Sequence, residues 1–167
     1  IANGKEHIKE AEEKFSGVFL YLQLGVAYIS QKNYKDASEA YELVVKYEPN
    51  NTSYHATLAF LYKQIGKYDE ARIEAIKVFK LQPENKEVLV FLQQLRGLDP
   101  NDPALHSSLA YIYRQTGETE KARQEFLIVK SIYEQAVAYN PKNSNYHFGL
   151  ANVYKELGEY EKAYQEV

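Results

Sequence analysis

Hydrophobic residues recur along this chain at intervals of three and four, in paired stretches separated by short polar turns. Between residues 18 and 51, one stripe has the order large residue, Leu, Gly, Tyr, and a second stripe begins at Ala37. Spacings of three and four place side chains on one face of an α-helix. The polar residues 31–34 separate the two stripes and would end the first helix. The pattern therefore predicts two amphipathic helices joined by a tight turn.

The same helix pair is written three more times. Residues 52–85 align with 18–51 without gaps, and two more copies begin at residues 103 and 144. The matched positions of the first stripe are Tyr21, Leu24, Gly25 and Tyr28, then His55, Leu58, Ala59 and Tyr62, then His106, Leu109, Ala110 and Tyr113, and finally His147, Leu150, Ala151 and Tyr154. A small residue at the third position lets two helices approach closely, and its large neighbours fill the space. A supersecondary unit repeated in this way indicates a repeat array.

A proline closes each of the first three copies, with Asn two residues later, and the same phrase, with Asp in that place, recurs at Pro100; the first two of these prolines, Pro49 and Pro83, lie 34 residues apart. Proline cannot continue the second helix, and Asn or Asp can cap the next one. The period and the order of large and small residues resemble the tetratricopeptide repeat family over residues 18–167. Tyrosine or histidine stands at the position of the family's usual tryptophan. The resemblance implies an all-α fold, a right-handed α-solenoid of antiparallel helix pairs, and a protein-binding scaffold.

Two intervals break the period. Residues 86–102 hold one helical stretch where a pair is expected, and the third copy contains seven extra residues. In the first interval, either a lone helix interrupts the array or residues are missing between Arg96 and Gly97, and we favour missing residues. In the second, either one long helix covers residues 119–139 or a similar join lies near Lys130. The predicted units are 1–17 (a helix or the end of an earlier repeat), repeats at 18–51 and 52–85, a half-repeat at 86–102, a third repeat at 103–143 and an incomplete fourth at 144–167.

The ends of the chain carry two further expectations. The amphipathic pattern of residues 4–15 predicts a helix that packs on the first repeat. Methionine is absent even at residue 1, and the last repeat is incomplete, so we expect this sequence to be part of a longer protein. An incomplete repeat leaves apolar surface that more repeats or another chain would cover.

Composition narrows the classes of partner. A net charge of −3 and a pI near 5.9 disfavour nucleic acid, including RNA read by helical repeats, and anionic membrane surfaces. No apolar stretch is long enough for direct membrane insertion, and the N-terminus lacks a signal pattern. We therefore expect a soluble protein and favour the cytoplasm, although the sequence does not determine the compartment. Without cysteine there is no disulfide, thiolate metal site or cysteine nucleophile.

The sequence offers no catalytic constellation. It has no Ser/His/Asp spacing and no glycine-rich phosphate loop, so we expect no enzyme activity and no cofactor. Three histidines, His55, His106 and His147, share one repeat position. Equivalent positions of successive repeats lie about one repeat apart, so we predict that these rings fill the aromatic slot of the family and bind no metal.

The helix face that the packing stripe leaves free holds the candidate binding residues. In the family, the first helices of the repeats line the concave side. By this resemblance the groove residues are Leu22, Val26, Ile29, Phe60, Lys63, Tyr111, Arg114, Phe148, Asn152 and Lys155. An exposed apolar row suggests a groove for a protein or peptide with apolar anchors, or for an amphipathic helix. Alternatively, Leu22, Val26 and Ile29 pack on the predicted N-terminal helix.

Two other functions stay open. The uncapped ends of the array could make the chain a self-assembling structural protein, a homo-oligomer. The chain could also be the regulatory or targeting part of a larger protein. The carboxylate clamp of co-chaperone members of the family is not supported, because its positions hold Leu22, Val26, Thr57, Ala104 and Ser108.

Overall fold

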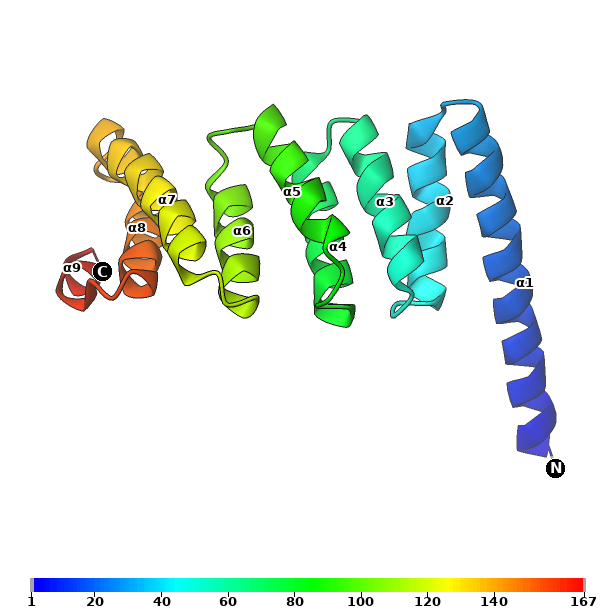
Figure 1. Ribbon diagram of the computed structural model, residues 1–167. Coiled ribbons are helices and arrows are strands. Elements are labelled where there is room, and N and C mark those ends of the chain that lie inside the picture. Colours follow the sequence, from blue (N-terminus) through cyan, green and yellow to red (C-terminus); the bar gives the residue numbers. More distant parts are fainter. Residues whose placement is uncertain (1, 167) are drawn as a thin grey trace. The chain divides into compact units, whose positions relative to one another are not determined.

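The computed structural model describes the backbone of residues 2–166 and the side chains of residues 16–166. Within these residues the chain is entirely helical, without a strand, which confirms the predicted all-α class (Figure 1). The helices, in chain order, are α1 (Ala2–Ser30), α2 (Tyr34–Tyr47), α3 (Thr52–Gln64), α4 (Tyr68–Leu81), α5 (Glu87–Leu98), α6 (Pro103–Gln115), α7 (Thr119–Tyr139), α8 (Ser144–Glu156) and α9 (Tyr160–Gln165).

Polar caps and glycines set the ends of the helices. Asn51, Asp102 and Asn143 each accept a hydrogen bond from the backbone N–H two residues later, at 3.2, 2.8 and 3.0 Å. These caps satisfy amides that have no partner inside the helix. Three of the turns within helix pairs contain a glycine with positive φ, at Gly66, Gly117 and Gly158. Glycine adopts this conformation without strain, which allows the chain to turn there. The polar and glycine-containing segments predicted as turns between paired helices are turns in the structure.

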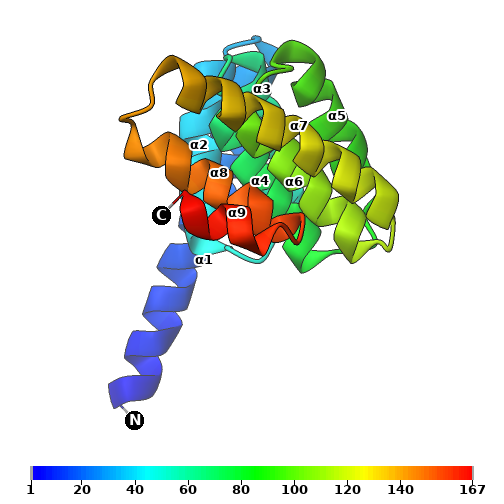
Figure 2. The same cartoon turned by 90° about the vertical axis from the view of Figure 1, so that its left-hand side faces the viewer.

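The chain forms two compact units, of which the first ends at Val88 and the second begins at Leu89. The first unit contains α1 to α4, and the second contains α6 to α9 with most of α5. Within the units, α1 pairs with α2, α3 with α4, α6 with α7, and α8 with α9. In addition α2 packs on α3, and α7 packs on both α6 and α8 (Figures 1 and 2). Consecutive antiparallel pairs of this kind are the building blocks of an α-solenoid.

The repeated stripe forms the core of each unit. Leu58, Leu109 and Leu150 are buried, and a Cβ added to Gly25 would lie 2.7 Å from the Tyr41 ring. The predicted reason for small residues at this position, close approach of two helices, therefore holds for the first pair. Leu24 differs from its counterparts and is 40% exposed. In the described part of the chain, no helix covers the face of α1 on which Leu24 lies.

Residues 4–15 do not form the separate helix that we predicted. They are the first part of α1, which runs without interruption to Ser30 (Figure 1). The Ser16-Gly17 pair between them and the first repeat is a turn signal, yet α1 continues through it, and no proline stands there to end the helix. A continuous helix cannot fold back on itself, so this segment does not cover Leu22, Val26 and Ile29. The side chains of residues 4–15 lie outside the described residues.

The two irregular intervals are both continuous helices. α5 is a lone helix that passes through Arg96 and Gly97, and α7 is a single helix of 21 residues that passes through Lys130. α5 contacts α6 as a second helix contacts the next repeat, because Gln93 Nε2 donates to Tyr113 Oη at 2.9 Å. Glu42 of α2 makes the equivalent contact with α3, because Tyr62 Oη donates to it at 2.8 Å and both pairs are 20 residues apart in sequence.

Candidate functional site

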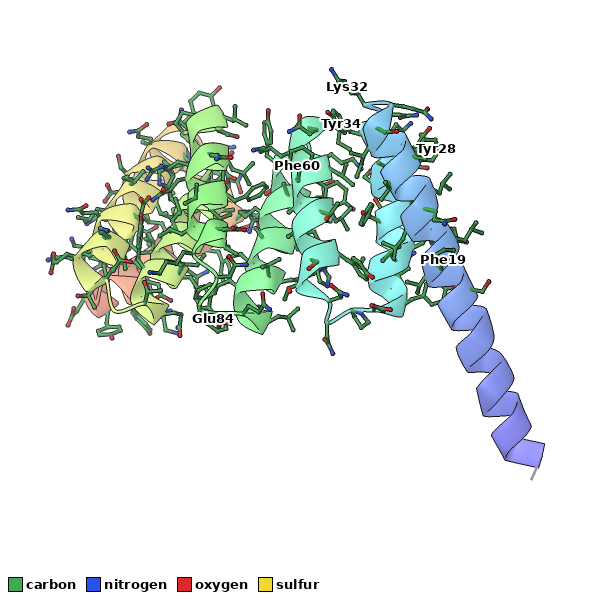
Figure 3. The ribbon with its side chains drawn as sticks, turned by 45° about the vertical axis from the view of Figure 1, so that its right-hand side comes forward. Phe19, Tyr28, Lys32, Tyr34, Phe60 and Glu84 are labelled. Carbon is green, nitrogen blue, oxygen red and sulfur yellow. The ribbon has the colours of Figure 1, made fainter. Side chains whose placement is uncertain are left out.

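In the first unit, the predicted groove residues lie on α1 and α3. Val26 and Phe60 are 57% and 40% exposed. The other three are half-buried: Leu22, Ile29 and Lys63. The Phe60 ring meets the Tyr34 ring of α2 edge-on, with centroids 6.1 Å apart (Figure 3). Tyr34, which sequence reasoning assigned only to a turn, thus holds the Phe60 ring in place.

In the second unit, the predicted residues lie on α6 and α8. Phe148 is 67% exposed. Asn152 and Lys155 are also exposed, and Tyr111 is half-buried. Arg114 forms an ion pair with Glu156 at the end of α8. The predicted basic rim therefore loses one free cation in this unit, because Arg114 is neutralised while it ties α6 to α8.

The three equivalent histidines make the same two hydrogen bonds. The carboxylates that face Nδ1 are Glu74 for His55 at 2.5 Å, Glu125 for His106 at 2.5 Å, and Glu166 for His147 at 2.6 Å. The backbone carbonyls that face Nε2 are those of Pro49, Pro100 and Pro141, at 2.8, 3.0 and 3.0 Å. Each ring thus joins the first helix of its repeat to the second helix and to the turn that precedes the repeat.

This arrangement gives the histidine position a polar role that the aromatic slot alone did not predict. A carbonyl only accepts, so Nε2 donates to it, and the contact at Nδ1 then holds a second proton between ring and carboxylate. The hydrogen bonds to Glu166 and to the Pro141 carbonyl raise the pKa of His147. The signal that could have revealed the pairs is a glutamate 19 residues after each histidine, which the first repeat lacks. Among the described side chains, no three His, Cys, Asp or Glu gather as a metal site requires.

Two of these buried carboxylates also accept a hydrogen bond from a cation. Lys77 donates to Glu74 at 2.7 Å, and Arg96 of α5 donates to Glu125 at 2.6 Å. A buried carboxylate is tolerated when its lone pairs are occupied in this way. A hollow of about 380 Å³ is lined by His55, Glu74 and Lys77 of this network, together with groups of α2 and Tyr62.

The long helix α7 contacts α6 in the register of a regular repeat and contacts α8 in a register shifted by seven residues. Toward α6, Glu125 bonds His106 from the seventh residue of α7, as Glu74 bonds His55 from the seventh residue of α4. Toward α8, Glu134 accepts from Tyr154 Oη at 3.0 Å. It is the sixteenth residue of its helix, whereas its counterpart in the first unit is the ninth of α2. Burial and this hydrogen bond raise the pKa of Tyr154 to about 12.

An offset of seven residues moves a neighbour along a helix without turning it to another face. Seven residues fall within about 20° of two full turns and advance the axis by about 10.5 Å. α8 therefore packs on the face of α7 that corresponds to the face of α2 on which α3 packs, two turns farther toward the C-terminus. The extra residues leave the mode of helix packing unchanged and create a step between α6 and α8.

A hollow of about 170 Å³ lies at this step. Its lining is Arg114, Thr119, Ala122, Arg123, Phe126, Glu156 and Leu157, and we call it the step pocket. Arg123 is the fifth residue of α7 and is exposed. The fifth residue of α2, Ser38, is 2% exposed. The position that is buried as Ser38 in α2 is therefore exposed in α7, where it holds a cation.

Family models place this chain among known sequences. Models described as tetratricopeptide repeat match residues 28–89 and 132–165, which together span more than half of the chain. No curated protein matches the sequence. None of the described helices is both long and apolar enough to cross a membrane.

Solved structures of low similarity resemble the chain over most of its length. One is MamA 41-end from Desulfovibrio magneticus RS-1, at 17% identity, with 90% of each chain covered and a TM-score of 0.41. Another is Pseudomonas aeruginosa PilF, at 18% identity, with 92% of this chain and 75% of that chain covered and a TM-score of 0.40. Likenesses at this level say nothing about partners, whereas the family models match the repeats themselves. The chain belongs to the tetratricopeptide repeat family.

Proposed function

We propose that this chain is a non-enzymatic protein-interaction scaffold that binds a peptide or an amphipathic helix through the first helices of its repeats. The observation that carries the proposal is the exposure of Phe148 on the face of α8 opposite its packed side. Leu150, Val153 and Tyr154 of the same helix are buried. A large aromatic that the fold does not need for its own core is the typical anchor of a protein interface.

The magnitude of the expected contact supports this proposal. Covering a side chain of this size contributes about 1.5–3 kcal/mol, and a few such anchors dominate the affinity of most interfaces. Asn152 and Lys155 flank Phe148 with polar groups, as the rim of an interface does. In the first unit, Val26 and Phe60 offer a second apolar surface with the same place in the repeat.

The test uses peptides selected from a random display library against the full chain. Binding of a selected peptide is then measured by calorimetry for the wild type, for Phe148→Asp and for a matched control. Tyr139→Asp is the control, because Tyr139 is 92% exposed and belongs to a second helix, α7. We expect Phe148→Asp to weaken binding at least tenfold and Tyr139→Asp to leave it unchanged. Equal binding by the wild type and Phe148→Asp would refute the proposal.

Self-association is a second candidate function, favoured by the uncovered face of α1. Leu20 and Leu24 are 61% and 40% exposed there, whereas Leu58 at the position of Leu24 in α3 is buried against α2. A second copy could cover this face as α2 covers that of α3. The molecular mass should then rise with concentration, and Leu24→Asp should hold the chain at the mass of a monomer. A concentration-independent monomer mass for the wild type would exclude this function.

A further inference from the structure

We propose that the step pocket binds the side-chain carboxylate of an acidic residue in a partner peptide, with an apolar neighbour of that residue on the pocket floor. The inference deepens the proposed function, on which it rests for the nature of the occupant, a peptide. It names a site that lies at the ends of α6 and α8 and at the beginning of α7, apart from Phe148.

The pocket is built by the two registers of α7. In a regular repeat, the next first helix packs on the second helix nearer its beginning, as Tyr54 of α3 meets the ring of Tyr41 in α2. Here α8 packs about 10.5 Å farther along α7, so only its last turn reaches the edge of the pocket, at Glu156 and Leu157. The hollow lies where the shift of α8 leaves the beginning of α7 and the end of α6 without a covering helix.

The charge of the lining selects the sign of the ligand. Arg114 and Glu156 neutralise one another in an ion pair. Among the described residues, Arg123 makes no ion pair, although it lies on the same wall. The nearby Glu118 is held by Lys121, with Oε2 and Nζ 2.5 Å apart. One uncompensated positive charge remains in the pocket, and a guanidinium is suited to bind a carboxylate through two parallel hydrogen bonds.

The apolar part of the lining selects the neighbour of that charge. Ala122 and Phe126 are buried and form the floor, and Leu157 is half-buried beside them. A volume of about 170 Å³ admits a carboxylate with its aliphatic stem and part of an adjacent apolar side chain. A monoanion balances the single free charge, whereas a phosphate dianion would place excess negative charge beside Glu156. The lining therefore fits glutamate or aspartate better than a phosphorylated residue.

To test carboxylate binding in the step pocket, the full chain is titrated with three short probes, and backbone amide and arginine Nε–H signals are followed by NMR. The probes are N-acetyl-leucyl-glutamic acid amide, its glutamine isostere, and the corresponding phosphoserine dipeptide. We expect the glutamate probe to shift signals at the first turns of α7 and to bind about tenfold more tightly than the glutamine probe, as one charge-assisted hydrogen-bond pair provides. Added salt should reduce this preference, because the site is open to solvent.

Variants assign the preference to a residue. Arg123→Gln should abolish the preference for glutamate over glutamine, while Lys142→Gln, which removes the same charge from an exposed position outside the lining, should keep it. Phe148→Asp should leave dipeptide binding intact, so failure of the groove proposal is distinguishable from failure of this one. Equal binding of the glutamate and glutamine probes, or a preference that survives in Arg123→Gln, would overturn the inference. Tighter binding of the phosphoserine probe that depends on Arg123 would replace it with a phosphate site.

Discussion

Replacing Gly149 of α8 by alanine should destabilise the protein, although alanine is the better helix former. A Cβ at this position would lie 2.5 Å from two atoms of the Tyr133 ring of α7 and 2.9 Å from a third. The gain in helix propensity is about 1 kcal/mol, and overpacking of this kind costs about 1–3 kcal/mol. Tyr133 cannot move out freely, since it packs against the core cluster that contains Leu150 and Val153. We expect a net loss of about 1 kcal/mol.

The chain supplies a matched control at Gly97 of α5. There an added Cβ would have no atom within 4 Å, so Gly97→Ala should stabilise the protein by about 0.5–1 kcal/mol. Urea denaturation followed by far-UV circular dichroism measures both free energies of unfolding. Removal of the ring by Tyr133→Ala should abolish the overpacking that destabilises Gly149→Ala, so the double-mutant cycle should show strong coupling. If Gly149→Ala proves as stabilising as Gly97→Ala, then α8 is not packed on α7 two turns beyond the regular position.

Three further predictions concern the polar network and a turn. Glu125→Ala should reduce the free energy of unfolding by about 3–5 kcal/mol in urea denaturation, because it leaves His106 and Arg96 without their buried partner. Because the pKa of His147 is raised in the folded protein, its protonated ring should stabilise α8 and α9 fully at pH values below the ordinary histidine pKa of about 6.5. This stabilisation should fade as the pH rises through the higher pKa of the folded protein, and amide exchange of α8 measured at several pH values would show it. Gly117→Ala should lower the midpoint of thermal unfolding by a few degrees, since the residue has a φ of 82°.

The repeat pattern was sufficient to predict the helices because the same positions recur in each copy. A buried leucine at Leu58, Leu109 and Leu150 and a glycine or cap at each turn carry that information locally. The pattern failed at residues 4–15, where the helix was correct but its independence was not. Amphipathic spacing gives the face of a helix and says nothing about its length, and a Ser-Gly pair, as at residues 16–17, is too weak a stop signal to distinguish one long helix from two.

The step pocket could not be predicted in the same way. Arg123 and Leu157 are far apart in sequence, and their proximity follows from where α8 packs along α7. The seven extra residues were visible, yet one long helix and a gap in the sequence explained them equally well. The ion pair between Arg114 and Glu156 likewise joins residues 42 positions apart, so the predicted basic rim could not be corrected without the fold.

A map of the bound peptide decides whether the first helices of the repeats form the binding surface. The full chain is titrated with a display-selected peptide, and the changes in backbone amide shifts are assigned to residues by NMR. We predict that the largest changes fall on the first helices of the repeats, around Phe148 and Asn152 of α8 and Tyr111 of α6. Changes confined to the second helices, with those of Phe148 and its neighbours unaffected, would contradict a scaffold that binds through its first helices.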